Sequence, residues 1–521
     1  MRSTLAILAA LTFLTNSPIK AESARKPNVI FILADDLGIG NLSCYGADNY
    51  QSPNIDKLAA TGMRFTRSFT ASLCGPSRAL IMTGRYAFRN GSTNQDACMQ
   101  LPNSELQLAR IFKSAQYTTA YIGKWGQLPG EPDEAGFDDY LRFQGSGVYW
   151  NDQPGKPEAY RNNGKELKLG EKEYMPHIMH DRVTMFLRAN QTKPFFLFYS
   201  LAHVHGEIRP TPDSSPDSKD LFGDNIRYMD KLVGKLINEL DELKLRDKTL
   251  IIFMGDNGTG KGQHPRSTIG GRNLSGMKGS MLEGGGLVPT IVNWPGKVPS
   301  GMVSANLMDS TDLIPTFAEI VGVTLPKERV FDGISFAQQL LGKPGPKREW
   351  IYNQLASMWY VREENWKLNE KGELFDMSDA PFAEKLISES NDTEATKAAR
   401  TRLAAALAKL NPAGGILDQG DGTGRHANKN KKNSNSTKST TEEPTSPNAD
   451  SLKKADALTI ERSAKFDRLD KEKVGKFTLD FYVANQSDRS AATERFKRMD
   501  TNADGFVTRE EYLLNGNKKQ K

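Results

Sequence analysis

Three runs of consecutive apolar residues constrain the fold of this 521-residue chain more than any other feature. They cover residues 29–34, 194–200 and 249–254. Uninterrupted runs of this length are typical of strands that are buried on both faces, as in a parallel sheet. Between the second and third runs, residues 224–245 place apolar side chains at helical spacing. The pattern therefore predicts an α/β domain in which helices flank a central sheet.

Polar side chains follow each of the three predicted strands. Open α/β sheets place their chemistry at the carboxyl ends of the strands, so we expect these side chains to share one edge of the sheet. Carboxylate and amide oxygens are hard ligands, which suit Ca²⁺ or Mg²⁺ better than softer metals. The strand ends therefore predict a divalent-cation site made by Asp35, Asp36, Asp256 and Asn257. An ordinary strand-end turn is the alternative for Asp35 and Asp36 alone.

The densest motif is Cys74-Gly75-Pro76-Ser77-Arg78, which is followed by Thr83-Gly84-Arg85. It resembles the C-x-P-S-R and T-G-R signature of the formylglycine-dependent sulfatases (arylsulfatase-like, type I). The resemblance extends over most of residues 27–380 and includes segments 122–125 (IGKW), 256–258 (DNG) and 332–335 (DGIS). It implies an alkaline-phosphatase-like fold with a mixed central sheet. For Cys74 taken alone, a buried Cys in a turn before a helix is the alternative.

The resemblance also implies cofactors and residue roles. A maturation enzyme would oxidise Cys74 to formylglycine, whose hydrate supplies a metal ligand and a hydroxyl nucleophile. The cation would bind the sulfate and acidify that hydroxyl. Arg78 would hold the formylglycine, while Lys124 and Lys278 would grip sulfate oxygens. Positive charge is needed there because the ester is anionic and its leaving group gains charge.

The predicted site also includes one histidine, and the sequence differs from the family pattern at two positions. The family places a His after the second strand, where it donates a proton to the leaving group or contacts sulfate, and the spacing favours His205 over His203. Gly126 stands where the family commonly has a His that contacts the hydrated aldehyde. Leu287 stands where an Arg is usual, and we expect it to alter local packing or a salt bridge.

Changes in pattern divide the rest of the chain. Residues 25–345 form the predicted sulfatase catalytic domain, and short aromatic, alternating segments over 346–424 predict a C-terminal subdomain with a small antiparallel sheet and a helix at 393–410. Residues 425–450 lack apolar content and are predicted to be a disordered linker. Residues 451–521 carry helix–loop–helix patterning and are predicted to be a separate EF-hand pair.

The prediction for this last module rests on a calcium loop. Residues 500–511 fit an EF-hand at every ligand position. The upstream loop starts at Asp470 but has Val474 and Phe481 where oxygen ligands belong. We therefore expect one Ca²⁺ site, whose ligands are the side chains of Asp500, Asn502, Asp504 and Glu511 and the backbone of Phe506.

The first 24 residues have the pattern of a secretory signal peptide. Arg2 precedes an apolar run over residues 5–14, and a polar stretch ends at Ala21, so cleavage is expected after Ala21 or Ala24. The run is about half of the ~20 residues that span a bilayer. We expect a secreted or periplasmic protein without stable membrane insertion; an uncleaved N-terminal anchor is the alternative. The net charge of +6 is small for this length and gives no support for nucleic-acid binding.

These features predict an exported sulfatase that hydrolyses sulfate esters. A sulfated saccharide or an aryl sulfate is the expected substrate, and the formylglycine-generating maturation enzyme is the expected partner. Two alternatives remain open. A phosphoester or phosphonate hydrolase of the same fold would use the same cations, and a calcium-dependent polysaccharide-binding protein derived from a sulfatase is allowed by Gly126. The sequence also leaves open whether Cys44 and Cys98 form a disulfide.

Overall fold

The computed structural model describes residues 26–153, 159–427, 476–484, 489–500, 504–508 and 512. The chain separates into two compact units, Met1–Asn433 and Ser434–Lys521, which we describe one at a time. The predicted signal peptide and most of the predicted linker lie outside the described residues. The first three linker positions lie inside them, and Ala427 forms a β-bridge with Gly420. The described part of the first unit thus runs past the predicted boundary at 424.

A ten-stranded mixed sheet forms the centre of the first unit. The three predicted strands are its middle: β1 (Asn28–Ala34) lies between β8 (Phe195–Ser200) and β9 (Thr249–Gly255) and runs parallel to both. Every residue of these strands is buried, which explains the uninterrupted apolar runs. The sheet order is β13-β2-β12-β9-β1-β8-β4-β5-β6-β7. The remaining strands are β2 (Met63–Phe65), β4 (Thr118–Gly126), β5 (Asp139–Gln144), β6 (Ala159–Asn162), β7 (Lys165–Lys168), β12 (Thr290–Asn293) and β13 (Met302–Ser304).

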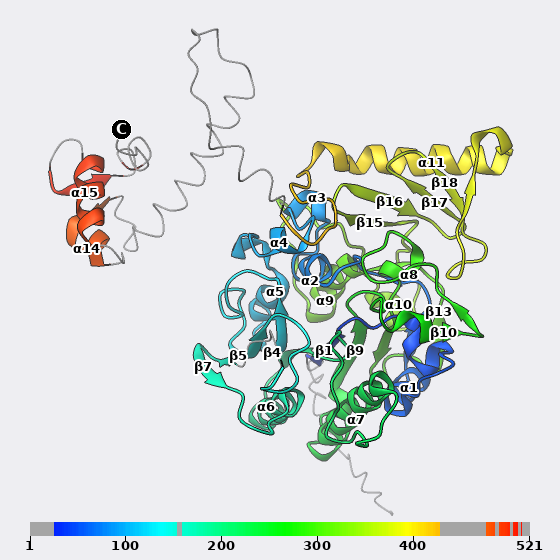
Figure 1. Cartoon of the computed structure of the whole chain (residues 1–521), viewed down its shortest axis with the longest axis horizontal. Coiled ribbons are helices and arrows are strands. Elements are labelled where there is room, and N and C mark those ends of the chain that lie inside the picture. The colour runs from blue at the N-terminus through cyan, green and yellow to red at the C-terminus, as the bar shows by residue number, and fades with distance from the viewer. Residues whose placement is uncertain are drawn as a thin grey trace, which may run out of the picture. The chain divides into compact units, whose positions relative to one another are not determined.

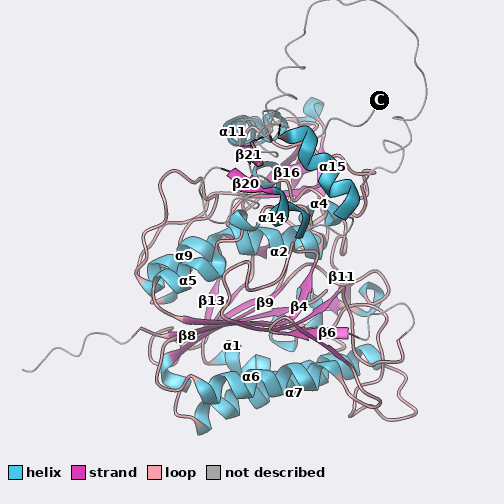
Figure 2. Cartoon of the chain, turned by 90° about the vertical axis from the view of Figure 1, so that its left-hand side faces the viewer, coloured by secondary structure: helices cyan, strands magenta, loops and turns pink. Residues whose placement is uncertain are grey.

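Helices cover both faces of this sheet (Figure 2). One face carries α1 (Pro53–Ala60), α6 (Met175–Ala189) and α7 (Leu221–Glu242), and the other carries α2 (Cys74–Thr83), α5 (Leu108–Ser114) and α9 (Leu313–Val321). Alternate residues of β1 enter the two resulting cores, with Ile30 and Ile32 in one and Val29 and Phe31 in the other. The predicted helix at 224–245 is α7. It starts earlier because Asp220 caps it, accepting a hydrogen bond from the amide of Gly223 at 3.1 Å.

The predicted C-terminal subdomain is part of the first unit and forms a small antiparallel sheet crossed by one long helix (Figure 1). Four of its strands match the predicted segments and a fifth follows them: β15 (Ile351–Leu355), β16 (Met358–Arg362), β17 (Trp366–Asn369), β18 (Leu374–Asp376) and β19 (Lys385–Ile387). The helix is α11 (Glu394–Leu410), and Thr393 caps its first turn. Short elements in the loops are β3 (Ser68–Phe69), α3 (Ala87–Asn90), α4 (Gln95–Cys98), β10 (Thr268–Ile269), β11 (Arg272–Asn273), α8 (Glu283–Gly286), β14 (Met308–Asp309) and α10 (Ala337–Leu340).

The second unit contains two helices and a two-stranded antiparallel sheet among its described residues. They are β20 (Lys476–Thr478), α14 (Leu479–Ala484), α15 (Arg489–Met499) and β21 (Phe506–Thr508). Phe477 pairs with Val507, so the eighth positions of the two predicted EF-hand loops lie opposite each other. The carboxylate of Asp500 accepts hydrogen bonds from the amides of Asp504 and Gly505 at 3.2 and 3.0 Å. The predicted ligands Asn502 and Glu511 lie outside the described residues.

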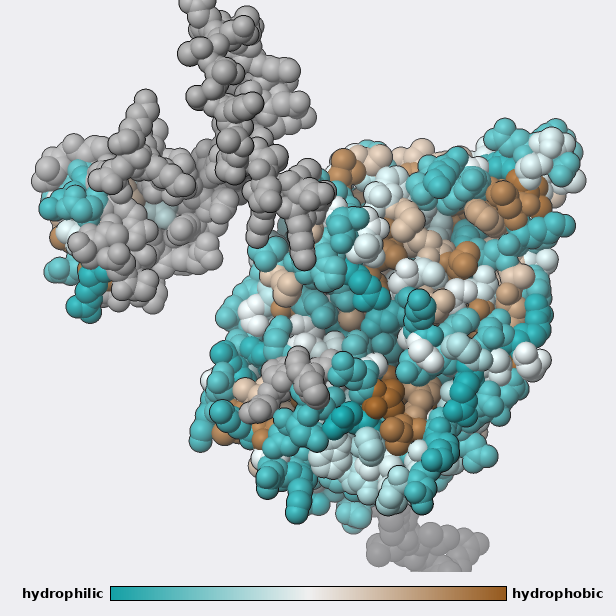
Figure 3. Space-filling model, viewed as in Figure 1, coloured by the Kyte–Doolittle hydropathy of each residue, from teal (hydrophilic) through white to brown (hydrophobic). Residues whose placement is uncertain are grey.

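The surface of the first unit is mostly hydrophilic on the face shown in Figure 3, with apolar side chains in scattered patches. Within the ranges that the structure describes, no helix combines the length and apolar content needed to cross a bilayer. Cys44, Cys74 and Cys98 all carry free thiols, so the structure contains no Cys44–Cys98 disulfide.

Candidate active site

Four predicted metal ligands meet at the carboxyl edge of the central sheet. Asp35 and Asp36 follow β1, while Asp256 and Asn257 follow β9, and the last residues of these two strands pair. The amide of Asp36 donates to Asp256 Oδ1 at 3.0 Å. All four side chains are buried. Asp36 has a positive φ of 58°, an uncommon conformation for a non-glycine residue that Asp adopts more readily than most.

Three cationic side chains face the three carboxylates; those of Arg78 and Lys124 are buried, and that of Lys278 is 8% exposed. Lys124, near the end of β4, places Nζ 2.7 Å from Asp35 Oδ2, and Lys278 places Nζ 2.6 Å from Asp36 Oδ1. Arg78 on α2 donates from Nη2 to Asp256 at 3.1 Å. The charges of these six side chains balance.

Arg78 is also fixed by neutral partners. Its Nη1 donates to the carbonyl oxygen of Lys124 at 2.9 Å and to Ser200 Oγ at 2.6 Å. Tyr121 donates to the same carbonyl oxygen. The guanidinium therefore ties α2 to the ends of β4 and β8. Sequence reasoning missed Tyr121 and Ser200, since both lie inside apolar strand patterns.

The surroundings lower the pKa of Asp36 and raise the pKa of Asp256. Burial alone would raise the pKa of Asp36, but the charges of Lys278, His205 and Lys124 outweigh it and lower the value to about 2. Burial and the adjacent Asp35 charge raise the pKa of Asp256 to about 6. Both groups are therefore mainly ionised at neutral pH, which is the form that binds a cation.

The donor set fits a hard divalent cation. Asp35, Cys74 and Asp256 each offer one donor atom within 4.8 Å of the others, and Asp35, Asp36 and His205 form a second such group. Asn257 donates from Nδ2 to Asp36 and Gly258, both at 2.9 Å, which turns its Oδ1 away from them. That buried oxygen has no hydrogen-bond partner in the described structure. A lone amide oxygen beside three carboxylates matches the preferences of Ca²⁺ and Mg²⁺, and the ion would give the balanced site a net charge of about +2.

Cys74 is the first residue of α2 and is 1% exposed. Its side chain lies among the carboxylates and beside two amides that the sequence analysis did not identify, those of Gln95 and Gln127. Pro76 occupies the first turn of the helix, where its missing N–H costs nothing. Because Cys74 is at the amino end of α2, the positive end of the helix dipole also lies at this position, where it favours an anion.

The structure separates the two candidate histidines. His205 lies at the site, with Nε2 3.8 Å from Asp36 Oδ2, and burial lowers its pKa to about 3. His203 is wholly buried and shares a hydrogen bond of 2.9 Å with the hydroxyl of Tyr174, inside an aromatic cluster that includes Tyr149. Of the two imidazoles, His205 is therefore the one that lies beside the predicted metal ligands.

The two departures from the family pattern have different surroundings. Leu287 is 3% exposed and packs in an apolar cluster with Phe69, so it fills core space there. Gly126 lies at the site itself, against Arg78 and Lys124.

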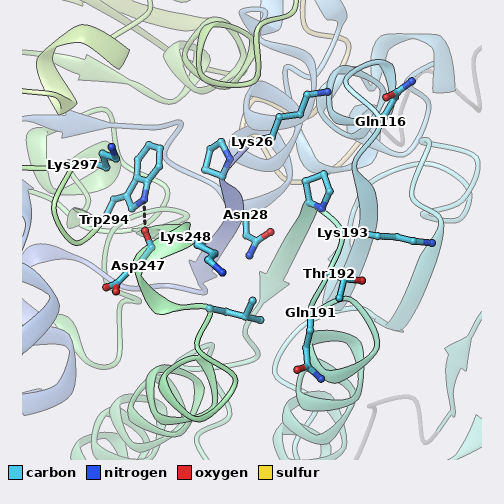
Figure 4. Close-up of a pocket in the computed structure, with 13 residues that line it drawn as sticks. Lys26, Asn28, Gln116, Gln191, Thr192, Lys193, Asp247, Lys248, Trp294 and Lys297 are labelled. Atoms are coloured by element: carbon cyan, nitrogen blue, oxygen red, sulfur yellow. Dashed lines mark hydrogen bonds between the residues drawn. The ribbon is translucent and has the colours of Figure 1, made fainter. Parts of the chain in front are cut away.

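A large surface hollow lies elsewhere, at the amino ends of the parallel strands (Figure 4). It has a volume of about 830 Å³, and Lys26, Asn28, Lys193, Lys248 and Trp294 are among the residues that line it. Asn28 begins β1, whereas Asp35 and Asp36 follow the other end of that strand. The hollow is therefore separate from the candidate active site.

Comparison with known proteins agrees with the fold. The sulfatase family model matches residues 27–323. Arylsulfatase G of Rattus norvegicus is 32% identical over 369 residues, covering 61% of this chain and 70% of the relative. N-acetylgalactosamine-6-sulfatase of Canis lupus familiaris is 31% identical over 354 residues, covering 62% and 67%. The solved structure of Ps i-CgsB in complex with k-i-k-neocarrahexaose has a TM-score of 0.65 and 26% identity, covering 74% of this chain and 93% of that one.

The fold is an α/β fold of the alkaline-phosphatase-like type, with a mixed ten-stranded sheet and a small antiparallel subdomain. The chain belongs to the sulfatase family, and it is a sulfuric ester hydrolase.

Proposed function

We propose that this chain is an exported enzyme that removes sulfate from sulfated saccharides, with formylglycine at position 74 and Ca²⁺ or Mg²⁺ on Asp35, Asp36, Asp256 and Asn257. The observation that carries the proposal is the position of Cys74, which shares a cluster of donor atoms with Asp35 and Asp256 at the start of α2. When bound, the cation and the formylglycine supply positive charge and a hydroxyl nucleophile.

The side chains of this chain bind and orient the ester. Lys124 lies 2.7 Å from Asp35, and Lys278 lies 2.6 Å from Asp36. Both ammonium groups donate hydrogen bonds to sulfate oxygens when the substrate enters. Arg78 ties α2 to the ends of β4 and β8 and to Asp256, which follows β9. The overall reaction adds water across the S–O bond, releasing sulfate and an alcohol. We propose that His205 protonates the leaving alcohol oxygen; since burial keeps its imidazole neutral, it must first take up a proton.

A saccharide substrate is supported by the relatives and by charge. One relative is named for a sulfated amino sugar, and one structural neighbour was solved with neocarrahexaose. The net charge of +6 gives mild attraction to a polyanion.

Two measurements test the proposal. Peptide mass spectrometry across residues 68–78, on protein made with the maturation enzyme, should find the aldehyde in place of the thiol. Turnover of an aryl sulfate should then greatly exceed turnover of the matching aryl phosphate. A preference for phosphate would favour the phosphoester hydrolase, and an unmodified thiol would favour the polysaccharide-binding protein.

For the C-terminal unit we propose a single Ca²⁺ site at Asp500, Asn502, Asp504, the backbone of Phe506 and Glu511. The pairing of Phe477 with Val507 supports this, because it aligns the two loops as a pair of EF-hands would align them. We also propose that the protein is secreted or periplasmic, on the strength of the signal-peptide pattern in residues 1–24.

A further inference from the structure

The backbone at position 126 cannot readily carry a side chain. Gly126 has a φ of +74°, and a β-carbon there would lie 3.3 Å from Arg78 Cδ and 3.4 Å from Lys124 Cε. The pairing of β4 with β5 also shifts register between Lys124 and Gly126, so that β4 holds one extra residue at this point. Gln127 directly follows β4, and its side chain reaches Cys74.

Two carboxamides flank the side chain of residue 74. Gln127 places Oε1 3.6 Å from Cys74 Sγ, and Gln95 places Nε2 3.4 Å from the same atom. The orientation of the Gln95 amide is fixed, because its Oε1 accepts from the amide of Gly75 at 2.7 Å. Gln95 Oε1 is also 3.5 Å from Cys74 Sγ, but it already accepts from the backbone N–H of Gly75, which can only donate. The NH₂ group, 3.4 Å from Sγ, is therefore the hydrogen-bond donor that Gln95 offers to position 74.

Gly75 provides the space that this arrangement needs. A β-carbon at position 75 would lie 2.5 Å from Gln95 Oε1 and 3.3 Å from Gln127 Cβ. The φ of Gly75 is not in the left-handed region. Space rather than backbone conformation therefore explains glycine at this variable position of the C-x-P-S-R signature.

A distant segment holds Gln95 in place. Gln95 begins α4, where Asn94 caps the helix by accepting from the amide of Ala97 at 2.9 Å. The amide of Gln95 itself donates to the carbonyl oxygen of Gly424 at 2.9 Å. The segment that ends the first unit thus returns to the edge of the active site and fixes one of the two carboxamides.

We propose that Gln95 and Gln127 hold the hydrated aldehyde at position 74, with Gln95 donating a hydrogen bond to one hydroxyl and Gln127 accepting one from the other. This inference rests on the proposed function, because it requires the aldehyde. The pair would supply the contact that the family pattern assigns to a His at position 126. A carboxamide does not titrate between pH 4 and 10, so this contact keeps the same charge across that range.

The test measures the state of the aldehyde as well as activity. The full chain is made with the maturation enzyme, and the aldehyde content is first counted by peptide mass spectrometry over residues 68–78. The folded protein is then labelled with an aminooxy probe, which reacts with the free aldehyde and not with its hydrate. Gln95→Leu and Gln127→Leu should each speed labelling about fivefold, the effect of losing one hydrogen bond to the hydrate. The turnover number should fall while KM stays nearly constant.

Polar variants and a matched control sharpen this test. Gln127→Glu keeps an acceptor and should label like the wild type, whereas Gln95→Glu lacks the donor and should label like Gln95→Leu. Gly75→Ala should also speed labelling, because the added β-carbon displaces Gln95. This variant provides the test if the leucine variants fail to fold. Gln100→Leu, at an exposed position just beyond α4, is the control and should change nothing. Unchanged labelling in both leucine variants, with the aldehyde present, overturns the inference; absence of the aldehyde from the wild type overturns the proposed function instead.

Discussion

The guanidinium of Arg362 forms a buried ion pair with the carboxylate of Glu283, with Nη2 2.7 Å from Oε1. Arg362 ends β16 of the small sheet, and Glu283 begins α8, five residues after Lys278. The side chains are 3% and 2% exposed. The amide of Glu283 also donates to Glu384 of the C-terminal subdomain at 2.6 Å. The subdomain thus anchors the loop that brings Lys278 to Asp36.

We predict that Arg362→Met lowers the free energy of unfolding by about 3–5 kcal/mol, because it leaves the Glu283 carboxylate buried without a partner. Chemical denaturation measures this loss. The control is Arg402→Met, which removes an exposed ion pair to Glu363 and should cost less than about 1 kcal/mol. Replacing Glu283 by Gln in the Arg362 variant should recover part of the loss. Similar losses for the two arginine variants would contradict a special role for the buried pair.

Cys74→Ala and Asp256→Ala should each abolish aryl-sulfate turnover. The first removes the precursor of the aldehyde, and the second removes a carboxylate that binds both Arg78 and the proposed cation. Cys44→Ala is the matched control, since Cys44 lies outside this cluster, and it should retain turnover. Isothermal titration with Ca²⁺ and with Mg²⁺ should show that the Asp256 variant has lost one binding site. Measurable turnover by the Cys74 variant would exclude a nucleophile derived from that residue.

His205→Ala should reduce turnover of saccharide sulfates much more than turnover of aryl sulfates. An alkoxide leaving group needs a proton far more than a phenolate does, and His205 is the imidazole nearest the carboxylates. The comparison of kcat for the two substrate classes measures this. His426→Ala, at an exposed position, should leave both values unchanged. Equal losses for the two classes would remove His205 from the proton-donor role.

The protein should lose stability in mild acid through His180. Burial, with the charge of Lys235, lowers the pKa of this imidazole from 6.5 to about 4 in the folded state. Its contribution is therefore fully present above pH 6.5 and is lost as the pH falls toward 4, because the unfolded chain binds the proton first. The loss amounts to about 3 kcal/mol. Unfolding free energies between pH 7.5 and 4.5 should thus fall less steeply in His180→Gln than in the wild type, and identical slopes would contradict the assignment.

Calcium binding by the C-terminal unit should be independent of the active site. In an Asp256→Ala chain, titration should find one remaining Ca²⁺ site, which Glu511→Ala removes because it deletes the bidentate ligand of the loop. Two remaining sites would mean that the loop beginning at Asp470 also binds. A chain that ends at residue 427 should keep nearly full aryl-sulfate turnover, and a large loss would make the C-terminal unit part of the enzyme.

Local sequence patterns were enough to predict the centre of the fold. The runs at 29–34, 194–200 and 249–254 are β1, β8 and β9, because strands buried on both faces must be apolar throughout. The aromatic segments after residue 346 are the small antiparallel sheet. The rest of the ten-strand order was not predictable, since β12 and β13 are short and their pairing with β2 joins segments far apart in the chain.

The sequence by itself determined the reaction class and most of the residues that carry charge. Asp35 and Asp256 follow buried strands, and Arg78 and Lys124 stand in motifs that resemble those of the sulfatase family. The tertiary structure decided which neutral groups complete the site. Gln95 lies 21 residues after Cys74 and is held by Gly424, and nothing local to residue 95 indicates that contact. It also chose His205 over His203, because packing against Tyr174 buries one imidazole in the core and leaves the other beside Asp36. A sequence motif indicates which chemical groups a site uses, whereas contacts between distant segments depend on how the whole chain packs.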